Sequence, residues 1–79
     1  MKIYLLTSNL DDYDQYDACV VCAENEESAK KMHPEDGKDI NSEYHENDFT
    51  WPKDINDIKC IEIGKSIINK KYIVLSSFY

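Results

Sequence analysis

The chain has 79 residues and a formal net charge of −7 at pH 7, from 16 acidic residues and nine lysines with no arginine. The length corresponds to one domain, and 42% hydrophobic and 32% charged residues are typical of a folded globular protein. The acidic balance argues against direct nucleic-acid binding, because nucleic-acid-binding proteins neutralise phosphates with lysine and arginine. No apolar run reaches the about 18 residues of a membrane span, and the short apolar start lacks signal-peptide features, so we expect a cytoplasmic protein.

Apolar and alternating segments predict four strands, at residues 2–7, 16–23, 58–63 and 72–78. In the second of them, alternate residues divide into two faces that are both fairly apolar. The order along the chain suggests two hairpin-like strand pairs with a helical segment between them. We therefore expect the strands to form one sheet.

A short helix is predicted at residues 25–32. Asn25 is a favourable N-cap, because its side chain can accept a hydrogen bond from a free amide of the first turn. Glutamates follow in the first turn and lysines in the last, which complements the helix dipole. His33-Pro34 ends the helix, since the residue before proline disfavours the helical conformation. The whole chain, 1–79, thus predicts a single α+β domain of ββαββ order, with a four-stranded, mainly antiparallel sheet and one short helix on one face.

A long acidic loop is predicted at about 34–57, interrupted by a few apolar and aromatic residues. Loops of this length are uncommon in compact domains and often have a function. Residues 11–57 hold 15 acidic residues and four lysines, a net charge of −11, whereas residues 58–79 have a net charge of +3. The sequence therefore predicts an anionic surface mounted on a nearly neutral sheet.

Three cysteines are present, Cys19, Cys22 and Cys60. The first two have the spacing of a zinc or redox half-site, but they lie in a predicted strand, where side chains three apart point to opposite faces. His33, His45 and Cys60 are conceivable further ligands, yet their spacing fits no zinc pattern. We expect structural thiols, no metal and no cofactor.

Two other binding motifs and nucleophilic catalysis are disfavoured by the residues present. Asp12 and Asp14 alternate as in a calcium-binding loop, but Asp17 stands where that loop needs glycine. Gly64-Lys65-Ser66 resembles the end of a phosphate-binding loop, but Lys59 occupies the position of its first glycine. No spacing supports a cysteine or histidine arranged for nucleophilic catalysis. We therefore expect a protein that is not an enzyme.

Aromatic residues accompany the acidic ones both in the long loop at about 34–57 and in a polar connection at residues 8–14, which holds three aspartates. Tyrosine and tryptophan often form the centre of protein interfaces, because they bring large contact area at small entropic cost. Trp51 has two interpretations: it folds back to cover the sheet, or it faces a partner. The acidic residues likewise either serve solubility alone or contact a partner. The predicted partner-binding surface comprises Asp11, Asp12, Tyr13, Asp14, Glu43, Tyr44, Glu46, Asp48 and Trp51.

Several segments together resemble a family of small accessory proteins encoded by bacteriophages and prophages. The resemblance is carried by Met1-Lys-Ile-Tyr-Leu-Leu6, Tyr13-Asp-Gln-Tyr-Asp17 with Ala18-Cys-Val-Val21, Ala23-Glu-Asn-Glu-Glu-Ser-Ala29, His33-Pro34, Trp51, Cys60-Ile-Glu-Ile-Gly64 and Ile73-Val-Leu-Ser-Ser-Phe78. It implies a phage accessory protein in the host cytoplasm and supplies no catalytic residues.

Small acidic phage proteins of this kind include anti-CRISPR proteins and other inhibitors of host defence. By this analogy, the chain is expected to be a stoichiometric inhibitor whose acidic surface occupies the basic surface of a host protein, such as a CRISPR effector or another nucleic-acid-binding complex, as a nucleic-acid mimic. The alternative is a structural or assembly module without catalysis, a homodimer joined through a sheet edge or part of a phage or host complex. Neither hypothesis involves direct nucleic-acid or membrane binding.

Overall fold

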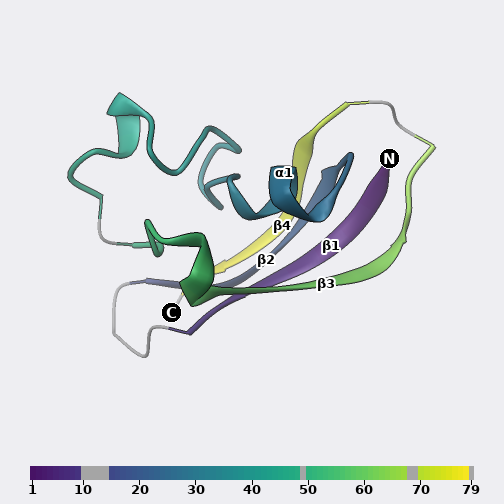
Figure 1. Cartoon of the computed structure of the whole chain (residues 1–79), viewed down its shortest axis with the longest axis horizontal. Helices are drawn as coiled ribbons and strands as arrows, with labels where there is room; N and C mark the ends of the chain where they lie inside the picture. The colour runs from purple at the N-terminus through teal and green to yellow at the C-terminus, as the bar shows by residue number, and fades with distance from the viewer. Residues whose placement is uncertain (10–14, 49, 68–69, 79) are drawn as a thin grey trace.

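The computed structural model describes residues 1–9, 15–48, 50–67 and 70–78 (Figure 1). Its elements, in chain order, are β1 (Lys2–Ser8), β2 (Tyr16–Ala23), α1 (Glu26–Lys30), the short 3-10 helices η1 (Glu43–His45) and η2 (Ile55–Asp57), β3 (Ile58–Lys65) and β4 (Tyr72–Phe78). The predicted α+β fold is confirmed: a four-stranded antiparallel sheet with one short helix packed against it, in ββαββ order. None of the helices in the described ranges is long and apolar enough to cross a membrane.

The strand order in the sheet is β3-β1-β2-β4. β1 and β2 form the predicted first hairpin, but β3 and β4 do not pair with each other. β3 instead pairs with β1, and β4 pairs with β2, so that they form the two edges of the sheet. The expectation of a second hairpin was therefore wrong. The two central strands are apolar on both faces, which suits interior positions in a sheet, whereas β3 carries Lys59, Glu62 and Lys65 at a solvent-facing edge.

The helix α1 is shorter than the predicted 25–32. Asn25 caps it as expected, with its side-chain oxygen accepting the Ser28 amide at 2.8 Å. Met32 leaves the helix to form an antiparallel bridge with Asp39. Between them the chain turns tightly, with the Gly37 amide donating to the His33 carbonyl at 2.8 Å and Gly37 at a φ of 77°. Glycine suits this position because other residues rarely adopt a positive φ.

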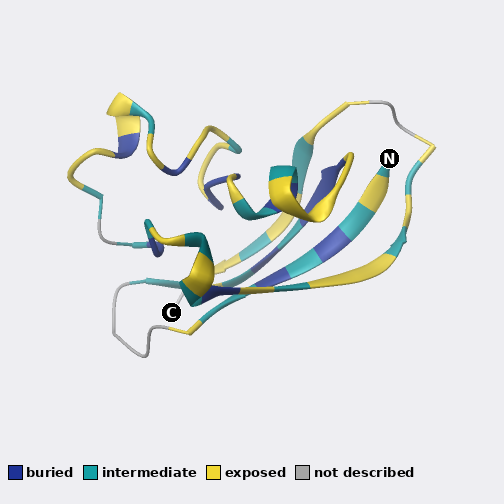
Figure 2. Cartoon of the chain, viewed as in Figure 1, coloured by how far each residue is buried: buried dark blue, intermediate teal, exposed yellow. Residues whose placement is uncertain are grey.

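We call residues 33–48 and 50–57 the loop layer. Together with α1 it covers one face of the sheet (Figures 1 and 2). Ile40 and Trp51, from the loop layer, are buried against sheet residues such as Leu6 and Val21. The loop layer is thus packed onto the sheet, because these two apolar side chains complete the core. The remaining core residues are Tyr4, Cys19, Ala23, Ala29, Met32 and Ile58.

The cysteines are free thiols within or beside this core. Cys19 is aligned with Leu6 and Cys22 with Ile3 in an unbroken register, so their side chains point to opposite faces of the sheet, as predicted. Burial raises the pKa of Cys19 to about 12 and that of Cys60 to about 11. Thiols with such raised pKa values carry almost no thiolate at neutral pH and are poor nucleophiles.

Because Trp51 is only 2% exposed, Trp51→Ala should destabilise the domain by about 3–5 kcal/mol, the range for a large aromatic removed from a core. Tyr44→Ala, a change at an exposed aromatic of the same layer, should cost less than about 0.5 kcal/mol. Urea unfolding followed by circular dichroism measures both. Equal unfolding midpoints for Trp51→Ala and the wild type would contradict the packing described.

Candidate functional site

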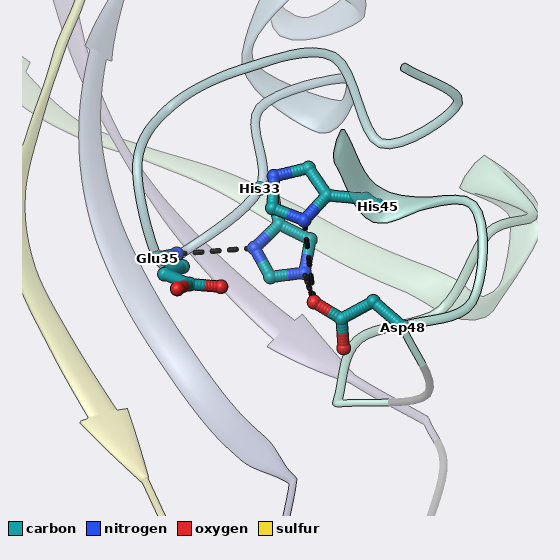
Figure 3. A group of neighbouring side chains, drawn as sticks. All are labelled: His33, Glu35, His45 and Asp48. Atoms are coloured by element: carbon teal, nitrogen blue, oxygen red, sulfur yellow. Dashed lines mark hydrogen bonds and ion pairs between the residues drawn. The ribbon is translucent and has the colours of Figure 1, made fainter. Parts of the chain in front are cut away.

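Two buried histidines lie at the centre of the loop layer (Figure 3). His33 lies three residues after the end of α1, and His45 is the last residue of η1. The imidazole rings are stacked, with centroids 3.7 Å apart and planes within 4° of parallel. His33 is 2% exposed and His45 is 3% exposed. Histidines this deeply buried need partners for their ring nitrogens.

Both ring nitrogens of His45 face carboxylates. Nε2 lies 2.9 Å from Oδ1 of Asp36, and Nδ1 lies 3.2 Å from Oδ2 of Asp48. Carboxylates accept hydrogen bonds, so the arrangement assigns a proton to each nitrogen and a positive charge to the ring. Burial alone would lower the pKa of His45, but hydrogen bonding and attraction to Asp36, and then to Asp48, outweigh it and raise that pKa.

His33 has the opposite character. Its Nδ1 accepts the Glu35 backbone N–H at 3.1 Å, which places the proton of the neutral ring on Nε2. That nitrogen lies 3.1 Å from Oδ2 of Asp48, within ion-pair distance, but off the direction that a hydrogen bond requires. Burial lowers the pKa of His33, and the neighbouring charge of His45 lowers it further. A neutral His33 therefore stacks on a charged His45.

Asp48 connects both rings to the next turn of the chain. Its Oδ1 accepts the Thr50 amide at 2.8 Å and the Thr50 hydroxyl at 2.5 Å, while Oδ2 faces the two histidines. Burial alone would raise the pKa of Asp48, but the Thr50 hydrogen bonds and the histidines lower it. Asp48 is thus an internal anchor, and its predicted contact with a partner stays a prediction.

The two histidines and the acidic residues around them also form a candidate metal site. Among the described residues, His33, Glu35, His45 and Asp48 offer ligand atoms that all lie within 4.8 Å of one another. A histidine binds a metal through an unprotonated nitrogen. On His33 the Glu35 N–H occupies the unprotonated Nδ1, and on His45 both nitrogens are bonded to carboxylates. A metal would therefore have to break these hydrogen bonds, so the donor set is better suited to protons.

Aspartates of the loop layer make a repeated local contact. In four places an aspartate side chain accepts the backbone N–H two residues further on, at 2.8–2.9 Å. This is the Asx-turn, a side-chain substitute for a backbone turn. The aspartates are Asp36, Asp39, Asp48 and Asp54. Much of the acidic composition of this segment is therefore used to fold it.

Both lysines of the loop layer are engaged with groups other than carboxylates. Lys38 Nζ lies 3.5 Å from the centroid of the Tyr44 ring. Lys53 Nζ donates to the backbone carbonyls of His45 and Glu46, at the end of η1. Cations are favourable there because the last carbonyls of a helix carry partial negative charge. Within the described ranges, no lysine ammonium lies within ion-pair distance of the carboxylates of Glu35, Glu43 or Glu46.

The predicted contact residues therefore divide into three groups. Glu43, Tyr44 and Glu46 are exposed on η1 and the residue that follows it, with Tyr44 at 70%. Trp51 belongs to the core, as in the interpretation in which it covers the sheet, and Asp48 is directed at the two histidines, so a partner contact by either residue stays a prediction. Asp11, Asp12, Tyr13 and Asp14 lie outside the described residues and stay predictions.

The sequence offered His33 and His45 as conceivable zinc ligands or as partners of Cys60 in catalysis, and it did not predict their hydrogen-bonded, stacked arrangement. His33 and His45 are 12 positions apart in a segment without periodicity, so no spacing rule joins them. The only signal was that both histidines of the chain fall within one acidic segment.

Comparisons with known protein families, with curated proteins and with solved structures gave no match.

The paired histidines predict a pH dependence of stability. The raised pKa of His45 stabilises the fold fully below the ordinary value of 6.5, and this contribution is lost as pH rises through the folded-state pKa. The lowered pKa of His33 acts in the reverse sense: its contribution is complete above 6.5 and declines as pH falls below that value. The histidine contribution to stability should therefore be greatest close to pH 6.5.

Melting temperatures measured between about pH 5 and 9 test this, a range that brackets the histidine titration. His45→Gln should flatten the alkaline side of the profile and His33→Gln the acidic side. An alkaline slope in His45→Gln equal to that of the wild type would contradict the assigned charge on His45.

Proposed function

We propose that this protein is a non-catalytic protein-binding domain that presents an acidic contact surface on its loop layer to a basic partner. The contact surface consists of Glu43, Tyr44 and Glu46. The observation that carries the proposal is the different use of the two kinds of acidic residue. The aspartates fold the layer, whereas Glu43 and Glu46 are exposed and, among the described residues, have no lysine within ion-pair distance. Carboxylates with no internal partner remain free to meet an external cation.

Hydrogen bonds of His45 and Lys53 hold this contact surface in position. His45 lies at the end of η1, and its ring is bonded to Asp36 and Asp48. Lys53 holds the carbonyls of His45 and Glu46 from the other side. A contact surface that is already ordered loses less entropy on binding than a mobile loop, which favours affinity. Tyr44 adds an exposed aromatic between the two glutamates, the type of residue that often anchors an interface.

The chemistry of the partner follows from the charge. Carboxylates at a surface attract a groove lined with lysine and arginine and accelerate the encounter. Grooves of this kind bind nucleic acid, so an acidic domain that occupies one excludes the nucleic acid. Together with the sequence resemblance to phage accessory proteins, this supports a stoichiometric inhibitor of a host nucleic-acid-handling complex, such as a CRISPR effector. The alternative, an assembly module, draws its support from a different surface, the uncovered face of the sheet.

The test uses the double variant Glu43→Lys/Glu46→Lys as bait in a bacterial lysate, beside the wild type. Its matched control is Asp17→Lys/Glu24→Lys, which changes the net charge equally at exposed residues outside the loop layer. The wild type and the control should retain the same nucleic-acid-binding protein at low salt and lose it at about 0.5 M salt, since exposed charges are screened there. The loop-layer variant should retain it at least tenfold less, about 1.4 kcal/mol.

Two further readouts complete the test. Addition of the wild type should displace labelled nucleic acid from the retained protein in proportion to the amount added. Equal retention by Glu43→Lys/Glu46→Lys and the wild type would contradict the proposed surface. Retention that resists salt would contradict its electrostatic character.

A further inference from the structure

The face of the sheet opposite α1 carries a continuous row of aliphatic side chains. Leu5 is aligned with Ile61 on one side and with Val20 on the other, and Val20 is aligned with Leu75. The row Ile61–Leu5–Val20–Leu75 therefore crosses all four strands. Residues directly opposite one another in a sheet point to the same face. The core residues Leu6 and Cys19 occupy the alternate positions, so this row lies on the other face, which we call the bare face.

The rows on each side of the aliphatic row add few charges. One consists of Gly64, Ile3, Cys22 and Tyr72, and the other of Lys59, Thr7, Ala18 and Ser77. Lys59 is the single charged residue among these twelve aligned positions. At the two ends of the aliphatic row, Leu75 is 66% and Ile61 is 44% exposed. When one face of an antiparallel sheet is solvated, that face is usually polar, so a bare face this apolar indicates a docking surface.

We propose that the bare face binds the bare face of a second copy of this chain. The charge distribution favours this occupant. The loop layer has eight acidic residues and two lysines and lies on the opposite face of the sheet. Face-to-face pairing turns both acidic layers outward, so that the two regions of strongest mutual repulsion are as far apart as the dimer permits. Pairing through the loop layers would bring them together.

The size of the bare face is consistent with a reversible dimer. Strands about 4.8 Å apart and residues about 3.4 Å apart give a four-stranded face, seven residues long, an area of roughly 450 Å². Two copies then bury roughly 900 Å², just below the about 1,000 Å² at which specific interfaces begin. Two sheets pack face to face about 10 Å apart, so the row of each copy would lie against the row of the other.

This dimer rests on different residues from the proposed function, and the two can fail independently. The dimer depends on aliphatic side chains of the sheet, whereas partner binding depends on Glu43, Tyr44 and Glu46. If both hold, the dimer presents two acidic contact surfaces on opposite sides. Two linked surfaces bind a partner with two sites more tightly than either alone, by effective concentration.

Sedimentation velocity of the purified chain at rising concentration, with light scattering as a second measure of mass, tests the dimer. The wild type should change from monomer to dimer between about 1 and 100 μM, the range of a modest interface. At about 0.5 M salt the dimer should persist, because apolar contacts are not screened. A wild type that stays monomeric throughout this range overturns the proposal.

Two variants locate the interface. Ile61→Lys lies on the edge strand β3, and Leu75→Lys lies on the opposite edge strand β4. Both side chains are exposed, so each variant should keep the far-ultraviolet circular dichroism of the wild type, and each should abolish the dimer. Glu27→Lys, an exposed change on α1, which packs on the opposite face of the sheet, should leave it intact. A dimer lost only with Leu75→Lys, or only with Ile61→Lys, would instead be joined through one sheet edge and would overturn the proposal.

Discussion

The loop layer depends on one buried charge, the imidazolium of His45 held between Asp36 and Asp48. An isolated charge in such a position is costly, because the protein interior solvates it less well than water. Two carboxylates offset that cost here, and the flat face of neutral His33 covers the ring. Removing one partner of a fully buried ion pair lowers the free energy of unfolding by about 3–5 kcal/mol. Removing Asp36 should lower it by less, because Asp36 is partly exposed. The histidine–aspartate group therefore supplies the charged contribution to the stability of the loop layer, beside the apolar anchors Ile40 and Trp51.

These contacts explain why an acidic, polar segment packs at all. Ile40 and Trp51 supply its apolar contribution to the core, and the histidine–aspartate group fixes the polar part between them. Because the aspartates are used in turns and ion pairs, the glutamates of η1 and its surroundings are left facing solvent. The different roles of the aspartates and the glutamates follow from side-chain length. An aspartate side chain reaches the backbone amide two residues ahead, and the longer glutamate side chain does so less readily.

The parts of the fold that depend on local pattern could be predicted from the sequence. Strands β2 and β4 begin and end at the predicted residues, and Asn25 caps α1 as expected, because alternation and capping are properties of neighbouring residues. Strand order depends on contacts between distant residues, so the sequence pattern did not predict that β3 and β4 would lie at opposite edges of the sheet. The same holds for the site. Glu43, Tyr44 and Glu46 were predicted as surface contact residues, and they are exposed. Trp51 packs with Ile40 and the sheet, and Asp48 faces the two histidines. No rule of sequence spacing connects residues this far apart in the chain.

The central claim is the protonation of the histidine pair, and nitrogen chemical shifts of the imidazole rings measure it directly. A long-range ¹H–¹⁵N spectrum near neutral pH should show both nitrogens of His45 protonated, and His33 as the neutral tautomer with its proton on Nε2. Adding Zn²⁺ should leave both patterns unchanged. A neutral His45 at that pH, or zinc-induced shifts of both rings, would show that the loop layer is held by something other than a buried imidazolium and would contradict the account.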